Sequence, residues 1–224
     1  MRKLLVVLVV VLVVGAMQFA RLEYPSRVLT KADVDAYVRA IDAGITLPAD
    51  EKTEILAHLR AWGEADDGKP VFMLNLMRYR DALRADVPGI ADRALSPRAA
   101  NTHYESVAIP LLFRSGAYPL FGGTPQGVWG GDTPSSNVIG FTRAVDDWGR
   151  VLVVRYPDRR TFFEFLCDPA FLAVMPYKIA ALDVNLVPLD AEITVPNASW
   201  IVAALVAAAA MLVGFLAGTR RRLA

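Results

Sequence analysis

The sequence predicts an α+β domain flanked by N-terminal and C-terminal transmembrane helices. Hydrophobic residues make up 54% and charged residues 21% of the 224 residues, more apolar than an average soluble domain. The excess lies at the two ends, because 4–20 and 200–218 contain no charged residue. Between the ends, short apolar runs alternate with segments of helical periodicity. The roughly 180 residues that remain are enough for one domain with its own core.

The C-terminal segment 200–218 is predicted to be a transmembrane helix. Its length corresponds to about 28 Å of helix, close to the roughly 30 Å hydrocarbon core of a bilayer. Trp200 stands where an interfacial aromatic residue belongs. The three arginines of 220–222 predict that 219–224 is a basic cytoplasmic tail, and 191–199 is expected to be a linker.

The N-terminal segment 1–21 has two interpretations. Residues 4–17 are uninterrupted and apolar behind a basic start, which fits either a retained transmembrane anchor or a cleaved signal peptide. In both interpretations, the domain that follows is expected to be exported across the membrane. The basic flanks then predict a protein of the inner membrane, with the central domain on the periplasmic side. A cytoplasmic central domain is the alternative.

Charge and composition exclude several functions. Without the six basic residues of the two ends, 18 basic residues face 23 acidic ones, so the middle carries a net charge of −5. This argues against nucleic acid as a partner, because phosphates require a basic face. Two histidines and one cysteine exclude a disulfide framework, a zinc cluster and an iron–sulfur site. We therefore expect no metal and no cofactor.

The segment 22–69 is predicted to be a connector with two helices. Thr30 as N-cap with Asp33 three residues later predicts a helix to about residue 41, and 50–65 shows a second apolar stripe. The domain proper is predicted over 70–190. It comprises strands at 71–79, 118–121, 137–144, 150–156 and 185–189, and helices at 98–115, 158–166 and 171–182.

The order of these elements predicts how the domain is built. From Pro70 it is strand, helix, strand, strand, helix, strand, which is the split βαβ, ferredoxin-like arrangement. Helices that layer on one face of such a sheet leave the other face in need of cover. Dimerisation commonly provides that cover, so we expect a homodimer.

Several motifs resemble a known family. The run 72–79, the helix end at 110–116, the segments 147–149 and 154–157, and Asp168-Pro169 are similar to an uncharacterised bacterial family of the dimeric α+β barrel, ferredoxin-like superfamily. Its relatives include cofactor-independent monooxygenases, EthD-like proteins and chlorite dismutases. The resemblance covers about 70–190 and implies a small-molecule cavity. The chain departs from the family at Gly149, at Asp158 and at Tyr177-Lys178.

The candidate binding residues each have two interpretations. Asn75 is an amide inside an apolar strand and must find partners, either a ligand or neighbouring loop backbone. Tyr104, Trp148 and Tyr156 would line an aromatic pocket or belong to the core. Arg78 and Arg155 would bind a carboxylate or phosphate, or form structural ion pairs with Asp147 or Asp158.

His103 is the one candidate catalytic base, although helix geometry places it about 100° from Tyr104 and so toward solvent. Two functions follow. The first is a membrane-anchored domain that binds a small apolar molecule, as an enzyme similar to the cofactor-independent monooxygenases or to isomerases. The alternative is a non-catalytic, membrane-tethered dimerisation and interaction module.

Overall fold

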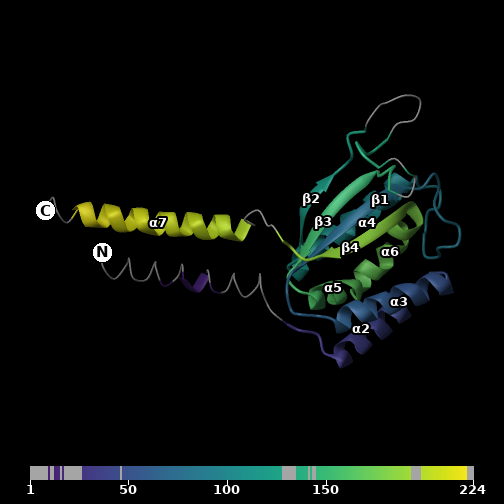
Figure 1. The fold of residues 1–224 in the computed structure, drawn as a ribbon, viewed down its shortest axis with the longest axis horizontal. Coiled ribbons are helices and arrows are strands. Elements are labelled where there is room, and N and C mark those ends of the chain that lie inside the picture. Colours follow the sequence, from purple (N-terminus) through teal and green to yellow (C-terminus); the bar gives the residue numbers. More distant parts are fainter. Residues whose placement is uncertain are drawn as a thin grey trace. The chain divides into compact units, whose positions relative to one another are not determined.

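The computed structural model describes residues 10, 13–15, 17, 27–45, 47–127, 135–140, 142, 145–192 and 198–220 (Figure 1). The chain divides into two compact units. The central unit is Ser26–Asp190, and the terminal unit combines Met1–Pro25 with Ala191–Ala224. The predictions for most of 1–21, for 193–197 and for 221–224 lie outside the described residues.

The central unit is built on one four-stranded antiparallel sheet in the order β2-β3-β1-β4. The strands are β1 (Val71–Tyr79), β2 (Tyr118–Gly123), β3 (Arg150–Tyr156) and β4 (Leu182–Leu189). Three helices accompany it: α4 (Pro97–Ser115), α5 (Arg159–Leu166) and α6 (Pro169–Ala181). The predicted α+β class is thus observed, and β1 has the predicted bounds.

The two faces of the sheet differ. Successive side chains of a strand point to opposite faces, and along β1 every second residue from Val71 to Met77 is buried. In register with these residues on β3 lie Tyr156, Val154 and Leu152, so the covered face runs across both central strands. The opposite face carries Phe72, Leu74 and Leu76 and is only partly buried. Figure 1 shows the sheet from this open face.

Local signals fix the ends of the helices. Ser96 accepts a hydrogen bond from the Ala99 amide at 3.2 Å and begins α4. Gly116 ends α4 with φ +83°, a left-handed conformation that glycine adopts at little cost. Asp158 and Asp168 are the N-caps of α5 and α6. These helices therefore begin and end where the sequence predicted, to within a few residues.

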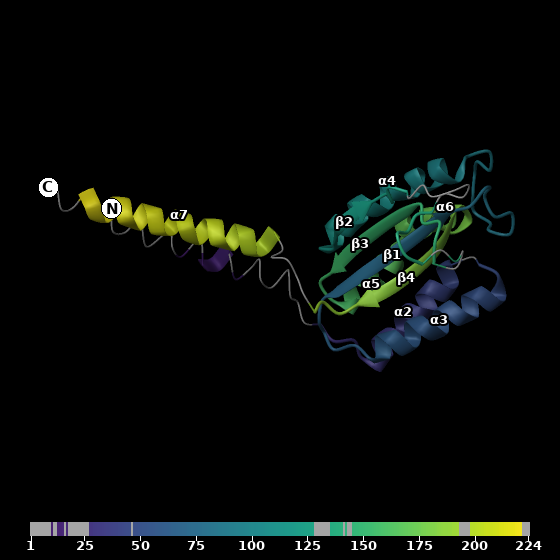
Figure 2. The same ribbon diagram turned by 45° about the horizontal axis from the view of Figure 1, so that its top comes forward.

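Two further helices, α2 (Lys31–Gly44) and α3 (Ala49–Glu64), belong to the central unit and lie side by side (Figures 1 and 2). Thr30 and Asp33 form the predicted capping box at the start of α2. Trp62 of α3 packs edge-on against Phe162 at 5.3 Å and stacks on Phe163 at 5.9 Å. The segment 22–69 therefore contributes to the same core as α5.

The strand predicted at 137–144 is wrong for the residues described there. Residues 137–140 form no strand, and Val138 and Ile139 are 77% and 87% exposed. The Asn137 amide donates to the carbonyls of Gly140 and Val145, at 2.9 and 2.5 Å. Side-chain bonds to local backbone compete with strand pairing, which explains why the apolar pattern misled the prediction.

The transmembrane part of the predicted fold class is also wrong. In the described part of the chain, no helix combines the length and the apolar character needed to cross a membrane. The apolar C-terminal segment forms the helix α7 (Ala198–Arg220). The inner-membrane location and the periplasmic placement depended on those spans and are corrected with them.

Candidate functional site

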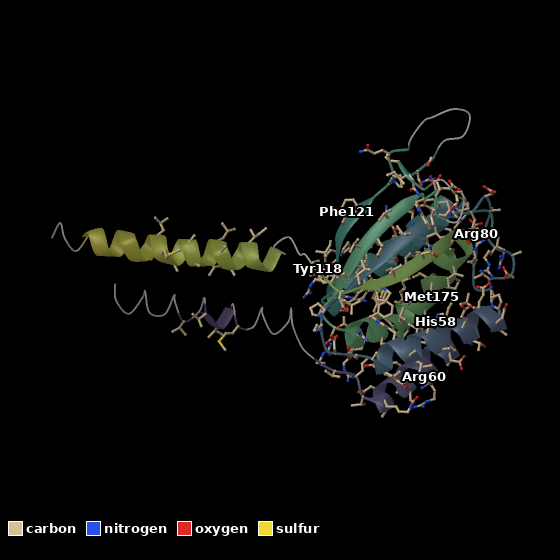
Figure 3. The ribbon with its side chains drawn as sticks, in the orientation of Figure 1. His58, Arg60, Arg80, Tyr118, Phe121 and Met175 are labelled. Atoms are coloured by element: carbon tan, nitrogen blue, oxygen red, sulfur yellow. The ribbon has the colours of Figure 1, made fainter. Side chains whose placement is uncertain are left out.

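A group of polar side chains lies between the covered face of the sheet and helices α4 and α6. Side chains fill this layer, in which the buried Met175 of α6 also lies (Figure 3). We define the interior cluster as Lys178, the two residues it contacts, and the ion pair whose charges act on it together with the amide bonded to that pair. They are Asn75, Asn101, Tyr104, Glu105, Arg150 and Lys178.

Asn75 is held in one orientation by its partners. It is 4% exposed, and its Nδ2 donates to the carbonyls of Met73 at 3.1 Å and Leu152 at 3.4 Å. With the amide nitrogen committed to backbone acceptors, Oδ1 faces α6 and accepts from Lys178 Nζ at 3.0 Å. Strand backbone therefore accepts from the Asn75 nitrogen and Lys178 donates to its oxygen, while the ligand-binding interpretation of Asn75 stays a prediction.

Lys178 is an unusual residue for this position. It lies in the last turn of α6, and its Nζ lies 5.3 Å from the centre of the Tyr104 ring. Burial lowers the pKa of Lys178 to about 8, with Glu105 opposing the shift and Arg150 adding to it. An ammonium has three donors, yet among the described residues the one to Asn75 is its single hydrogen bond. Two donors are left for another molecule.

The rim of the interior cluster is an ion pair with some access to solvent. Arg150 Nε lies 2.9 Å from Glu105 Oε1, with side-chain exposures of 27% and 18%. Asn101, 2% exposed, donates from Nδ2 to Glu105 at 3.1 Å and to the Tyr79 hydroxyl at 3.4 Å. Its buried Oδ1 has no hydrogen-bond partner among the described residues. A buried acceptor without a hydrogen bond costs free energy, so a donor from another molecule would be favoured at this oxygen.

Aromatic rings line the interior beside Lys178. Tyr104 meets Phe171 edge-on at 6.0 Å, Phe171 lies 4.4 Å from Phe165, and Phe165 lies 6.2 Å from Tyr156. Burial raises the pKa of Tyr104, with a smaller effect of Glu105, and raises that of Tyr156, so both phenols stay neutral. Tyr104 and Tyr156 thus share the apolar interior that the sequence predicted for them.

The structure places Arg78 and Trp148 elsewhere. Arg78 follows Asn75 by three positions on β1 and so lies on the open face. Its guanidinium lies over the Trp148 ring at 5.0 Å, donates to the Asp146 carbonyl and pairs with Asp147 at 3.7 Å. The Trp148 indole donates to the Val145 carbonyl at 2.9 Å. These contacts match the structural interpretation of Arg78 as a partner of Asp147.

Arg155 and His103 are also separate from the interior cluster. Arg155 is 1% exposed and lies over the Tyr118 ring at 5.6 Å, in register with Phe72. His103 is exposed on α4, and its ring meets Tyr177 edge-on at 4.5 Å. The described residues contain no group of three or more metal-binding side chains. The predicted site residues therefore fall into several places, with Asn75 and Tyr104 together at Lys178.

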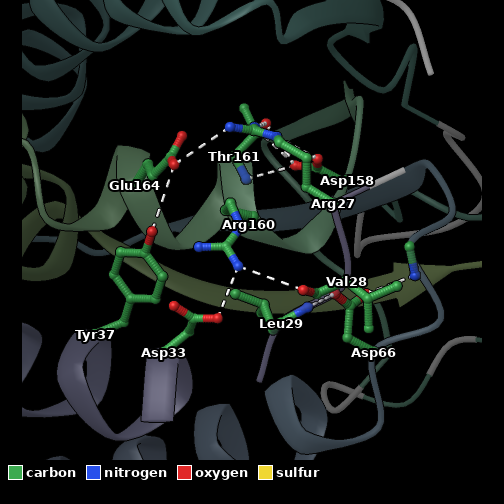
Figure 4. Close-up of polar contacts among 11 residues, drawn as sticks. Arg27, Val28, Leu29, Asp33, Tyr37, Asp66, Asp158, Arg160, Thr161 and Glu164 are labelled. Atoms are coloured by element: carbon green, nitrogen blue, oxygen red, sulfur yellow. Dashed lines mark hydrogen bonds and ion pairs between the residues drawn. The ribbon is translucent and has the colours of Figure 1, made fainter. Parts of the chain in front are cut away.

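A second buried charge lies beyond the other end of β3, at Asp158 (Figure 4). Its carboxylate, fully buried, accepts from the Thr161 amide and hydroxyl, both at 2.7 Å, and from Arg27 Nε at 3.1 Å. Arg27 also donates to the Thr161 hydroxyl at 3.0 Å. This network connects the start of the central unit to α5, and its hydrogen-bond donors and acceptors are paired with one another.

Sequence reasoning missed Lys178, Glu105 and Arg150, although one signal was present. Lys178 is the only charged residue in the segment 169–181, and the positions three and four away hold Val174, Met175, Ala181 and Leu182. A lysine without an acidic neighbour on its own helix, in an otherwise apolar segment, is a candidate for burial. Glu105 and Arg150 carry no comparable signal.

Comparison with solved structures finds the fold in RPA0582, a protein of unknown function from Rhodopseudomonas palustris. The structure of methylated RPA0582 is 24% identical, with a TM-score of 0.50, and covers 64% of this chain and 93% of that chain. A second RPA0582 structure has a TM-score of 0.48 at 24% identity, with coverages of 64% and 94%. Likeness at this identity shows the fold alone. No protein-family model matches the chain, and no curated protein is significantly similar to it.

Proposed function

We propose that the central unit binds a small, largely apolar molecule in its interior and transfers a proton to and from it, as an isomerase does. The observation that carries this proposal is the Lys178 amine, which belongs to a half-buried side chain, lies beside the Tyr104 ring and, among the described residues, makes one hydrogen bond, to Asn75. Fold likeness to a protein of unknown function is compatible with this proposal and adds nothing to its chemistry.

The chemistry requires only the residues of the interior cluster. The neutral Lys178 amine takes a proton from the ligand, which leaves an anion beside the ammonium that forms. The ammonium then returns the proton to a different atom of the ligand, so that no proton is gained and no electron is lost. A pKa of about 8 suits this cycle, because both protonation states are populated near neutral pH.

The remaining groups orient the reactants. Asn75 Oδ1 fixes the Lys178 nitrogen, while the Tyr104 ring supports it from one side. Tyr156, Phe165 and Phe171 pack on one another in the core beside the interior cluster, and these apolar surroundings favour an apolar ligand. His103, the base expected from the sequence, is exposed on another side of α4 and has no part in this proposal.

Hydrogen exchange into ligands tests the proposed reaction. The full chain would be incubated in D₂O with a panel of small enolisable ketones, and deuterium incorporation would be followed by mass spectrometry. We expect incorporation with the native chain and with Lys69→Met, which removes an exposed lysine paired with Asp67. Lys178→Met should abolish it. Equal incorporation in all three proteins, or none in any, would reject the reaction.

The open face of the sheet supports a second candidate, a homodimerisation module. Phe121 on β2 and Val187 and Leu189 on β4 are 60%, 39% and 40% exposed (Figure 3). Leu74 and Phe72 lie in register with the two β4 residues, so an apolar surface crosses the sheet. We propose that a second copy of the chain covers this surface, since apolar side chains of this size are poorly placed in water.

Light scattering of the full chain tests this second candidate. Phe121→Glu should convert a dimer into a monomer, because it buries a charge at the interface. Phe113→Glu is the matched control, since Phe113 is 61% exposed on α4, away from the open face. A monomeric native chain, or identical masses for the two variants, would reject the open face as the interface.

A further inference from the structure

We infer that the interior cluster holds an anion, namely a single negatively charged oxygen group of a small apolar molecule, with the Lys178 ammonium as its counter-ion. This inference rests on the proposed function, because it names the chemical class of the ligand at the same site. It goes further in that it predicts which molecules bind, whether or not a reaction follows.

The charges of the interior cluster do not balance. The charged groups that act on the Lys178 ammonium are Glu105 of α4 and Arg150 of β3. Glu105 is already paired with Arg150, at 2.9 Å. Two cations and one carboxylate leave the cluster with one positive charge in surroundings that are mostly apolar. A buried charge is expensive unless it is paired, so a monoanion would complete the cluster.

The Lys178 ammonium also has more hydrogen-bond donors than acceptors around it. Lys178 uses one of its three donors on Asn75 among the described residues. A carboxylate or enolate oxygen accepts charge-assisted hydrogen bonds, which are stronger than neutral ones. Asn75 itself offers the ammonium only a neutral acceptor, because it is an amide. The position opposite Lys178 therefore lacks the negative charge that a structural lysine would normally have.

The surroundings of Lys178 are aromatic and indicate what the rest of the ligand is like. Phe171 and Phe165 lie beside Tyr104, and the ring contacts continue to Tyr156. Among the described residues, Arg150 is the one cation that acts on Lys178, and the ring packing makes the remaining surroundings apolar, so they favour a ligand with one charge and an apolar remainder. Arg150 and Glu105 are partly exposed, so this side of the interior cluster is the one that solvent reaches.

Matched pairs of acids and amides test the inference by calorimetry on the full chain. The probes are acetate and acetamide, benzoate and benzamide, and phenylacetate and phenylacetamide. Within each pair the shape is nearly constant and the charge differs. We expect at least one acid to bind ten or more times tighter than its amide, with an aromatic acid preferred to acetate.

Two variants and one control test whether Lys178 is the counter-ion of the bound acid. Lys178→Met removes the counter-ion and should cost the acid at least tenfold in affinity. Asn75→Asp places a carboxylate opposite Lys178, so it should compete as an internal anion and also remove acid binding. Because it replaces the nitrogen that donates to the Met73 and Leu152 carbonyls, its fold is checked by circular dichroism, and Lys178→Met remains the deciding variant. Lys69→Met should leave every affinity unchanged, because Lys69 is exposed and pairs with Asp67.

The dependence on pH gives an independent measure. The preferred acid stays an anion above pH 6, so its affinity follows the protonation of Lys178 alone among the groups named. Affinity should be constant below the pKa of about 8 and fall up to tenfold per pH unit above it. This fall should vanish in Lys178→Met.

The outcomes distinguish the two proposals. If amides bind as tightly as acids, the anion inference is overturned and small-molecule binding stands. If an acid binds equally well to native chain and Lys178→Met, the counter-ion is another residue and the inference is again overturned. If no acid binds, the inference is overturned, and deuterium exchange of the enolisable ketones decides separately whether the proposed function stands.

Discussion

Two charged groups of the central unit, the buried Asp158 and the half-buried Lys178, differ in how fully their hydrogen bonds are paired. The Asp158 carboxylate accepts hydrogen bonds from Thr161 and Arg27 and leaves none of its neighbours short of a partner. The Lys178 ammonium has one neutral acceptor and donors to spare among the described residues. A charge that serves the fold is saturated by its surroundings. A charge that is left unsaturated is the better candidate for binding something else.

The largest expected effect comes from removing the saturated charge. Asp158→Ala should lower the free energy of unfolding by about 3 kcal/mol, because it removes both a helix cap and charge-assisted hydrogen bonds. Asp168→Ala is the matched control: Asp168 caps α6 through the Ala170 amide at 2.8 Å but has no long-range partner among the described residues. Its loss should cost about 1 kcal/mol. Urea unfolding followed by tryptophan fluorescence measures both, and equal losses would contradict the contrast.

An effect of intermediate size concerns the unsaturated charge and pH. Because the folded state lowers the pKa of Lys178 from 10.5 to about 8, the unfolded chain binds more protons between these values. Stability therefore rises with pH in that window. From pH 8 to pH 9.5 the native chain should gain roughly 1.5 kcal/mol over Lys178→Met. Denaturant unfolding at both pH values measures this, and parallel curves for the two proteins would refute the lowered pKa.

The smallest effect belongs to an ionisable residue near the interior cluster that is not buried. His103 contacts Tyr177 edge-on at the surface of α4. His103→Ala should change the free energy of unfolding by less than about 0.5 kcal/mol, as surface substitutions usually do. It should also leave benzoate affinity unchanged in calorimetry. A loss of affinity comparable to that of Lys178→Met would restore His103 as a site residue.

The sequence predicted much of the fold because local signals determine it. The strand 71–79, the capping box at Thr30 and the helix end at Gly116 each depend on a few neighbouring residues, and all three are observed. The segment 137–144 failed because side-chain bonds of Asn137 replace strand pairing there, which an apolar pattern cannot reveal. The prediction of membrane spans from the apolar ends failed, because among the described residues no helix is both long and apolar enough to cross a membrane.

The candidate site was harder to predict, since it joins residues far apart in the chain. Asn75 and Tyr104 were recognised by residue type, but their common partner Lys178 lies 103 positions from Asn75. In the sequence, Arg78 and Arg155 were as plausible site residues as Asn75. Strand alternation, however, places both arginines on the open face of the sheet. Which polar residue meets which is decided by the antiparallel pairing and by the helices packed on it, and no local pattern records either.

The most direct test of this account is the titration of Lys178 itself. The full chain, labelled with ¹³C at the lysine ε-carbons, would be followed by NMR from pH 6 to pH 11, with Lys178→Met to assign the resonance. The account predicts a midpoint of about 8 for Lys178, moving upward when a bound acid supplies the missing negative charge. A midpoint near 10.5 that no acid changes would contradict it, because the ammonium would then be an ordinary solvated lysine.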